Sequence, residues 1–148
     1  MKKRISAVFA IAAVLALAAV ACGGGGSKSQ APSGGSVGVT LKDFSISFAE
    51  PGVKTGQVTF AIKNDGPSLH EFVILQTDLA PTALPTHEEK GVKVADEESL
   101  KGMAEKEDIA PGTSTTLTVS LPPGNYVMIC NIPGHYIQGM ATGFSVSS

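Results

Sequence analysis

Apolar and polar residues alternate over much of the chain after residue 36, and this period of two limits the folds that the chain can adopt. The alternation covers residues 37–41, 44–48, 58–62, 70–75, 115–121, 126–130 and 140–146. Turn-forming segments such as Asn64-Asp65-Gly66-Pro67 separate the runs. Such alternation predicts β-strands with one buried face. Seven or so short strands without a long helical period predict an all-β fold, an antiparallel two-sheet Greek-key β-sandwich.

Two places depart from this pattern. The inward phase slips by one residue near Asp43, which predicts a bulge or bend in an edge strand. Residues 79–110 contain prolines and an acidic run, and we interpret them as a polar insertion between strands. At most one short helix is expected within the insertion, around Asp96 to Glu107, and Gly102 weakens it.

The N-terminus has the pattern of an export signal. Three basic residues at positions 2–4 precede an uncharged stretch over residues 5–20, which ends in small residues before Cys22. A membrane-spanning helix needs about twenty apolar residues with polar flanks, and this stretch is shorter. Residues 1–21 are therefore predicted to be a signal peptide, and the protein is predicted to be exported.

The residues at the predicted cleavage site, 17–22, resemble the lipobox of bacterial lipoproteins. Ala19 stands where such boxes usually carry leucine or another bulky aliphatic residue. The resemblance implies that Cys22 becomes the lipidated first residue of the mature protein. Ordinary signal cleavage after a small-x-small triplet is the alternative.

Cleavage would leave an acidic chain with one folded domain. After residue 21 there are eight basic and thirteen acidic side chains, a net charge of −5, which argues against a nucleic-acid partner. Residues 22–36 are rich in Gly and Ser and are predicted to form a lipid-anchored flexible linker. Residues 37–148 have the usual length of one compact domain, which we expect to be monomeric.

The second cysteine, Cys130, has neighbours that favour a functional role. Alone it could equally be a buried inert thiol or the partner of Cys22 in a disulfide. However, Cys130 closes a predicted strand on its inward face, and His135 follows a Pro-Gly turn. Met140 then opens the next strand, also on its inward face. His70, at the start of an earlier strand, can reach the same end of the sandwich.

A thiolate, two imidazoles and a thioether form a donor set that suits copper. Sulfur ligands favour Cu(I) and imidazoles accept Cu(II), so a rigid compromise geometry lets the ion change oxidation state with little reorganisation. We therefore predict one copper ion bound by His70, Cys130, His135 and Met140. Zinc is disfavoured because Met is not among its usual ligands. A c-type haem would need a Cys-x-x-Cys-His run, which the sequence lacks.

The same residues could also be read as a thiol nucleophile with a histidine base. That reading is disfavoured because catalytic Cys and His normally come from separate elements, whereas Cys130 and His135 share one turn. The third histidine, His87, is predicted to be a solvated surface residue of the insertion. Tyr126 and Tyr136 are predicted to pack in the interior.

The order of these residues, a distant upstream His and then Cys, four residues, His, four residues and Met, resembles that of the cupredoxins, the blue-copper proteins. The equal spacings are most similar to those of auracyanin, rusticyanin and sulfocyanin. The resemblance covers residues 37–148. It implies that Cys130 is the thiolate ligand, that His70 and His135 are the imidazole ligands, and that Met140 is the axial ligand.

One departure from the family concerns the surroundings of the ligands. Many members carry Asn or Ser directly after the first ligand His, where the side chain ties two loops together. Here that residue is Glu71, so the departure concerns the interactions around the ligands and not the ligands themselves. Asn131, directly after Cys130, is expected to take part of this role.

Three functions from different classes follow. The first is a one-electron carrier between membrane or extracytoplasmic redox partners. On this hypothesis the protein is expected not to be an enzyme. The second is an extracytoplasmic copper trafficking or storage protein, and the third is an adhesion-type sandwich with a vestigial site. The small number of methionines favours the carrier. A multicopper oxidase or nitrite reductase would need further copper centres, for which the chain has neither the length nor the histidines.

Overall fold

The computed structural model describes residues 34–148, and the predicted signal peptide, Cys22 and most of the predicted linker lie outside these residues. The described chain is almost entirely β-structure. Its strands are β1 Ser36–Lys42, β2 Ser45–Phe48, β3 Gly52–Lys54, β4 Gly56–Asn64, β5 His70–Gln76, β6 Thr86–Glu89, β7 Val92–Ala95, β8 Lys101–Ile109, β9 Ser114–Leu121, β10 Gly124–Ile129 and β11 Ala141–Ser147. Among the described residues, no helix has the length and apolar character needed to cross a membrane.

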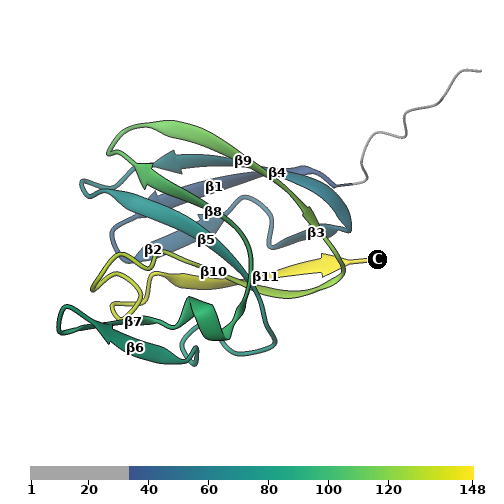
Figure 1. Ribbon diagram of the computed structural model, residues 1–148. Coiled ribbons are helices and arrows are strands. Elements are labelled where there is room, and N and C mark those ends of the chain that lie inside the picture. The colour runs from purple at the N-terminus through teal and green to yellow at the C-terminus, as the bar shows by residue number, and fades with distance from the viewer. Residues whose placement is uncertain (1–33) are drawn as a thin grey trace, which may run out of the picture.

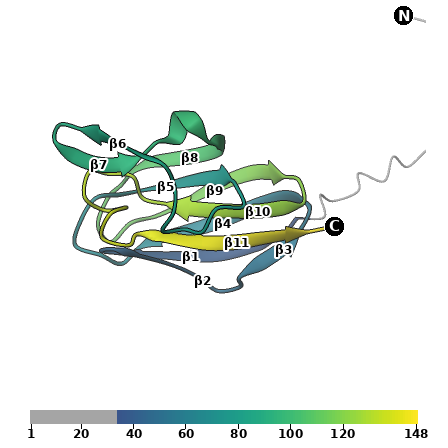
Figure 2. The same cartoon turned by 90° about the horizontal axis from the view of Figure 1, so that it is seen from below.

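Two sheets form the predicted sandwich. One has the strand order β2-β1-β4-β9 and the other has the order β3-β11-β10-β5-β8. Their inner faces bury the alternating residues that the sequence pattern assigned to the interior, including Val39, Phe60, Phe72, Met128 and Phe144. The all-β prediction and the two-sheet sandwich are therefore confirmed (Figures 1 and 2).

The sheets are mixed rather than purely antiparallel. β1 pairs with β4 in parallel and β3 pairs with β11 in parallel, while the other neighbours are antiparallel. Parallel neighbours cannot be joined by a tight hairpin, and here other strands lie between β1 and β4 and between β3 and β11 along the chain.

The phase slip near Asp43 marks a hairpin instead of a bulge. β1 and β2 pair antiparallel with Lys42 opposite Ser45, so Asp43 and Phe44 form a two-residue turn. Phe44 has a φ of 65°, an uncommon conformation for a bulky side chain, and its ring is 37% exposed. A two-residue turn shifts the inward phase by one position, which is why the pattern alone resembled a bulge.

The insertion is more structured than predicted. Only Glu97–Ser99 is helical, as one 3₁₀ turn, and β8 occupies most of the stretch where a short helix was expected. The helix is lost because β8 gains backbone hydrogen bonds to β5, which outweigh a local helix preference already lowered by Gly102. β6 and β7 form a separate hairpin, set beside the sandwich at the end where β10 connects to β11 (Figures 1 and 2).

The insertion covers the outer face of the five-stranded sheet. Leu84 and Ala95 are buried against Val73 of β5 and Val127 of β10, in a second apolar cluster. β5 and β10 are thus buried on both faces, and these two strands hold the residues of the candidate site at their ends.

Candidate metal centre

The Cys130–Met140 loop joins the ends of β10 and β11 and is held by its own backbone hydrogen bonds. The Cys130 N–H donates to the Met140 carbonyl at 3.1 Å, which extends the β10–β11 ladder by one pair. The Met140 N–H donates to the His135 carbonyl, also at 3.1 Å. Gly134 has a φ of 92°, which a residue with a side chain rarely adopts, so a glycine there allows the tight turn before His135.

Three of the predicted ligands converge at this end of the sandwich. His135 Nδ1 lies 3.3 Å from Cys130 Sγ and 3.2 Å from His70 Nδ1, and Cys130 Sγ lies 3.8 Å from His70 Nδ1. His70 and Cys130 are fully buried, whereas His135 is half-buried. Within residues 34–148, this is the one group of His, Cys or carboxylate side chains arranged for a metal ion.

The three donor atoms, Cys130 Sγ and the Nδ1 atoms of His70 and His135, form a triangle of the size that a first-row transition metal requires. An ion at about 2.0 to 2.3 Å from three coplanar donors separates the donors by roughly 3.5 to 4 Å, since each edge is √3 times the bond length. The observed edges of 3.2 to 3.8 Å fit this with small adjustments. Met140, the fourth predicted ligand, is fully buried and follows the same loop.

Burial sets the protonation of the metal-free site. Burial raises the pKa of the Cys130 thiol to about 11, although the N–H of Glu71, which lies 3.4 Å from the sulfur, opposes the rise. A metal ion that binds the thiolate must therefore displace a proton at neutral pH. Burial and the neighbouring His135 lower the pKa of His70, while Asp43 opposes this, so the His70 ring is held in the neutral form that ligates metals.

Asn131 ties the ligand loop to its surroundings, as predicted, and Glu71 takes part. The Asn131 N–H donates to Glu71 Oε1 at 2.6 Å. The Asn131 amide oxygen accepts from the Ala95 N–H at 2.7 Å, and its amide nitrogen donates to the Ala95 carbonyl at 3.0 Å and to Glu97 Oε1 at 2.7 Å. Burial, foremost, raises the pKa values of both glutamates. The residue that follows Cys130 is thus fastened to β5 and to the insertion.

Two residues of the Asp43-Phe44 turn also reach the site, and the sequence analysis did not identify them as site residues. Asp43 Oδ1 lies 3.2 Å from His70 Nε2, on the side of the ring away from Cys130. The Phe44 ring meets the His135 ring edge-on, with centroids 5.7 Å apart. The phase slip at this turn was the available signal, because it marks where β1 ends beside the site.

The end face around His135 is partly apolar. Ile137 is 51% exposed and Phe44 is 37% exposed, while Ile132 is partly buried against the core. His87 is exposed on β6, and Tyr126 and Tyr136 are buried, so these three predictions are confirmed. The Tyr136 hydroxyl accepts a hydrogen bond from the Leu84 N–H at 3.1 Å, which links the ligand loop to the insertion again.

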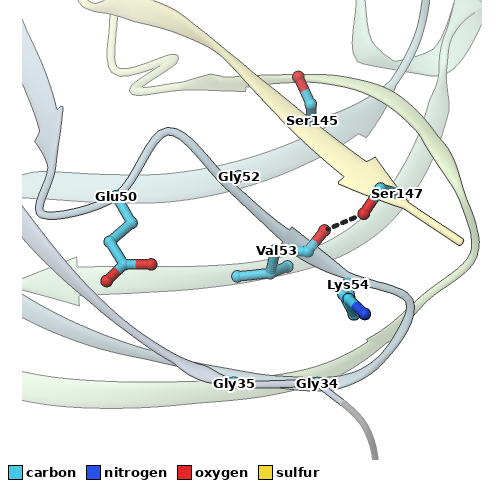
Figure 3. A pocket seen from close by; sticks show the side chains of 8 residues that line it. All are labelled: Gly34, Gly35, Glu50, Gly52, Val53, Lys54, Ser145 and Ser147. Atoms are coloured by element: carbon cyan, nitrogen blue, oxygen red, sulfur yellow. Dashed lines mark hydrogen bonds between the residues drawn. The ribbon is translucent and has the colours of Figure 1, made fainter.

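A surface pocket lies at the opposite end of the described domain, and none of the candidate metal ligands lines it. It has a volume of about 570 Å³, and the residues that line it are drawn in Figure 3. Its lining consists of Gly34, Gly35, Glu50, Gly52, Val53, Lys54, Ser145 and Ser147. The Ser147 hydroxyl donates to the Val53 carbonyl at 3.5 Å within this pocket.

The sequence matches the family described as a cupredoxin-like domain over residues 8–142. The chain belongs to the cupredoxin-like family. No curated protein sequence matches it significantly. Among solved structures, the reduced auracyanin of Roseiflexus castenholzii is 22% identical, with a TM-score of 0.56 over 76% of this chain and 97% of that chain.

Two further cupredoxin structures are similar in fold. Auracyanin B is 22% identical, with a TM-score of 0.56 over 80% of this chain and 92% of that chain. Rusticyanin from Thiobacillus ferrooxidans is 20% identical, with a TM-score of 0.50 over 76% of this chain and 77% of that chain. The cupredoxin family and the donor set together support one copper ion at this end of the sandwich.

Proposed function

We propose that this protein carries single electrons through one copper ion bound by His70, Cys130, His135 and Met140. The observation that carries the proposal is the triangle of Cys130 Sγ and the two histidine Nδ1 atoms, formed in a cupredoxin-like fold, with the buried Met140 at the end of the same loop. Bound copper would supply the redox change between Cu(I) and Cu(II). The protein supplies a rigid set of ligands, because backbone hydrogen bonds and Asn131 hold the loop in place before any metal binds.

Electrons are proposed to enter and leave through the His135 ring. It is half-buried, whereas His70 and Cys130 are fully buried, so His135 lies nearest to a partner that docks on this end. The exposed side chains of Phe44 and Ile137 beside it offer an apolar contact that excludes water. A transient redox complex needs only a small interface of this kind.

An electron carrier is favoured over a copper trafficking or storage protein. Trafficking proteins often present several exposed thioethers that pass Cu(I) onward. Here Met128 and Met140 are fully buried, and Met103 is packed against the core. The described domain therefore lacks an exposed methionine surface for metal transfer.

The cellular location is proposed from the N-terminal sequence. Residues 1–21 have the pattern of an export signal, and Cys22 has the position of a lipidated cysteine. The protein would then act outside the cytoplasm as a membrane-anchored lipoprotein, in the periplasm or at the cell surface. Its redox protein partners would be met within reach of the Gly/Ser-rich linker.

The copper proposal is tested by a visible absorption spectrum. Addition of Cu(II) to the purified protein is expected to give an intense blue thiolate charge-transfer colour at one copper per chain. Cys130→Ser is expected to abolish this colour because it removes the thiolate. A wild-type protein that stays colourless, or that binds copper only weakly, would contradict the proposed site.

A further inference from the structure

His70 Nε2, the ring nitrogen on the side away from Cys130, faces the carboxylate of Asp43, which is not one of the predicted ligands. His70 Nε2 and Asp43 Oδ1 are 3.2 Å apart, and both atoms are fully buried. Their contact does not meet the angle of a hydrogen bond, and neither atom has a hydrogen-bond partner elsewhere among the described residues. Buried polar groups without partners destabilise the folded state, which favours a direct hydrogen bond between these two.

Contacts with the β4–β5 loop hold Asp43 in this position. Asp43 lies in the β1–β2 turn, and its other oxygen, Oδ2, accepts a hydrogen bond from the Ser68 hydroxyl at 2.8 Å. The Asp65 N–H donates to the Leu41 carbonyl at 2.9 Å and joins the β4–β5 loop to the end of β1. A Cβ at Gly66 would lie 2.8 Å from Asp43 Oδ1 and 3.0 Å from His70 Nε2, so only glycine leaves room for this approach.

The pair determines which nitrogen of His70 carries the proton. A carboxylate oxygen can only accept, so the pair forms a hydrogen bond when Nε2 is protonated. Nδ1 is then unprotonated, and Nδ1 is the atom that faces Cys130 and His135. A carboxylate behind a ligating imidazole also makes the imidazole a stronger donor, and its negative charge favours the more highly charged metal ion.

We propose that Asp43 is a positioning residue that selects the Nε2–H tautomer of His70 and lowers the reduction potential of the bound copper. The second part rests on the proposed function, because it requires a copper ion on His70 Nδ1. The first part concerns the metal-free protein as well. Asp43 therefore has a role beyond closing the β1–β2 turn.

Two measurements test this role. Nitrogen-15 NMR of the His70 ring in the metal-free wild-type protein is expected to show protonated Nε2 and unprotonated Nδ1. Voltammetry of the copper-loaded Asp43→Asn variant is expected to show a higher potential than wild type. The expected change is roughly tenfold in the ratio of Cu(II) to Cu(I) affinity, which corresponds to about 59 mV for a one-electron couple.

The matched control is Asp65→Asn, which removes one negative charge from the neighbouring loop. The Asp65 carboxylate pairs with Lys63 at 2.8 Å, so its loss should leave the potential close to that of wild type. A purely structural role for Asp43 would give the two variants the same potential, and that result would overturn the proposal. A wild-type His70 protonated at Nδ1 would overturn it too, even if Asp43→Asn fails to fold. Failure of the blue colour in the wild type would instead contradict the proposed function and leave the tautomer test valid.

Discussion

At the scale of single residues, the site combines donors of different hardness in a buried setting. Cys130, His70 and Met140 are all removed from solvent. In such a setting each of these residues, as a copper ligand, would act on the balance between Cu(I) and Cu(II) without competition from water. The axial position is the one where a change of donor atom is expected to alter that balance without loss of the metal.

Met140→Gln is expected to lower the reduction potential while copper stays bound. The amide oxygen is a harder donor than the thioether and favours Cu(II), so the potential should fall by about 59 mV for each tenfold gain in relative Cu(II) affinity. Voltammetry and copper analysis of the purified variant measure the two effects. An unchanged potential would mean that Met140 only packs against the core.

At the scale of elements, the insertion determines how firmly the ligand-bearing strands are held. It buries the outer faces of β5 and β10, and it is linked to the ligand loop through Asn131 and through the Tyr136 hydroxyl. A solvated loop would neither bury the outer faces of β5 and β10 nor make these hydrogen bonds. The insertion is therefore part of the folded domain and supports the site from behind.

Leu84→Ala is expected to lower the free energy of unfolding by about 2 to 5 kcal/mol, the usual effect of removing a buried leucine. Leu84 is 5% exposed in the cluster under the insertion. Urea denaturation of the metal-free protein measures the change. Leu79→Ala is the matched control, because Leu79 is 44% exposed and its loss should change the stability by no more than about 0.5 kcal/mol. Equal effects from the two substitutions would show that the insertion does not pack on the sheet.

At the scale of the whole molecule, the negative charge is concentrated in one region. Residues 88–108 contain eight acidic and four basic side chains, a net charge of −4 out of the −5 that follows residue 21. β8 begins opposite Gln76 at the far end of β5 and reaches the ligand-bearing end at Ile109, opposite His70. Its acidic residues all follow residue 104 and lie in the half of β8 nearer that end. A basic redox partner would be drawn toward this end by opposite charge, over a Debye length of about 8 Å at physiological ionic strength.

Reversal of Glu98, Glu105 and Glu107 to Lys is expected to slow electron transfer with a basic partner protein and to flatten its dependence on salt. These three residues are exposed. Glu97 is left unchanged because its carboxylate accepts a hydrogen bond from Asn131, beside Cys130. Stopped-flow rates across a range of ionic strengths measure the effect, and exchange with a neutral small-molecule reductant is the control. Rates and salt slopes equal to wild type would exclude these side chains from docking.

The sequence by itself determined the sandwich and the set of candidate ligands. A period of two assigns residues to the inner face wherever only one face of a strand is buried, and this succeeded for strands such as β1 and β4. The Cys130-to-Met140 spacing fits one loop between two strand ends, so local chemistry was enough to propose the donors. Whether Met140 and the other three residues bind copper stays a prediction.

The tertiary structure decided what depends on pairing between distant segments. β8 is a strand because β5 offers it backbone hydrogen bonds, which no local propensity reveals. The parallel pairings of β1 with β4 and of β3 with β11 depend likewise on how the sheets close. Asp43 and His70 are 27 positions apart in the sequence. They meet only because the β1–β2 turn packs against the loop before β5. Contacts of this kind depend on the packing of the whole domain, and a single sequence contains no direct signal for them.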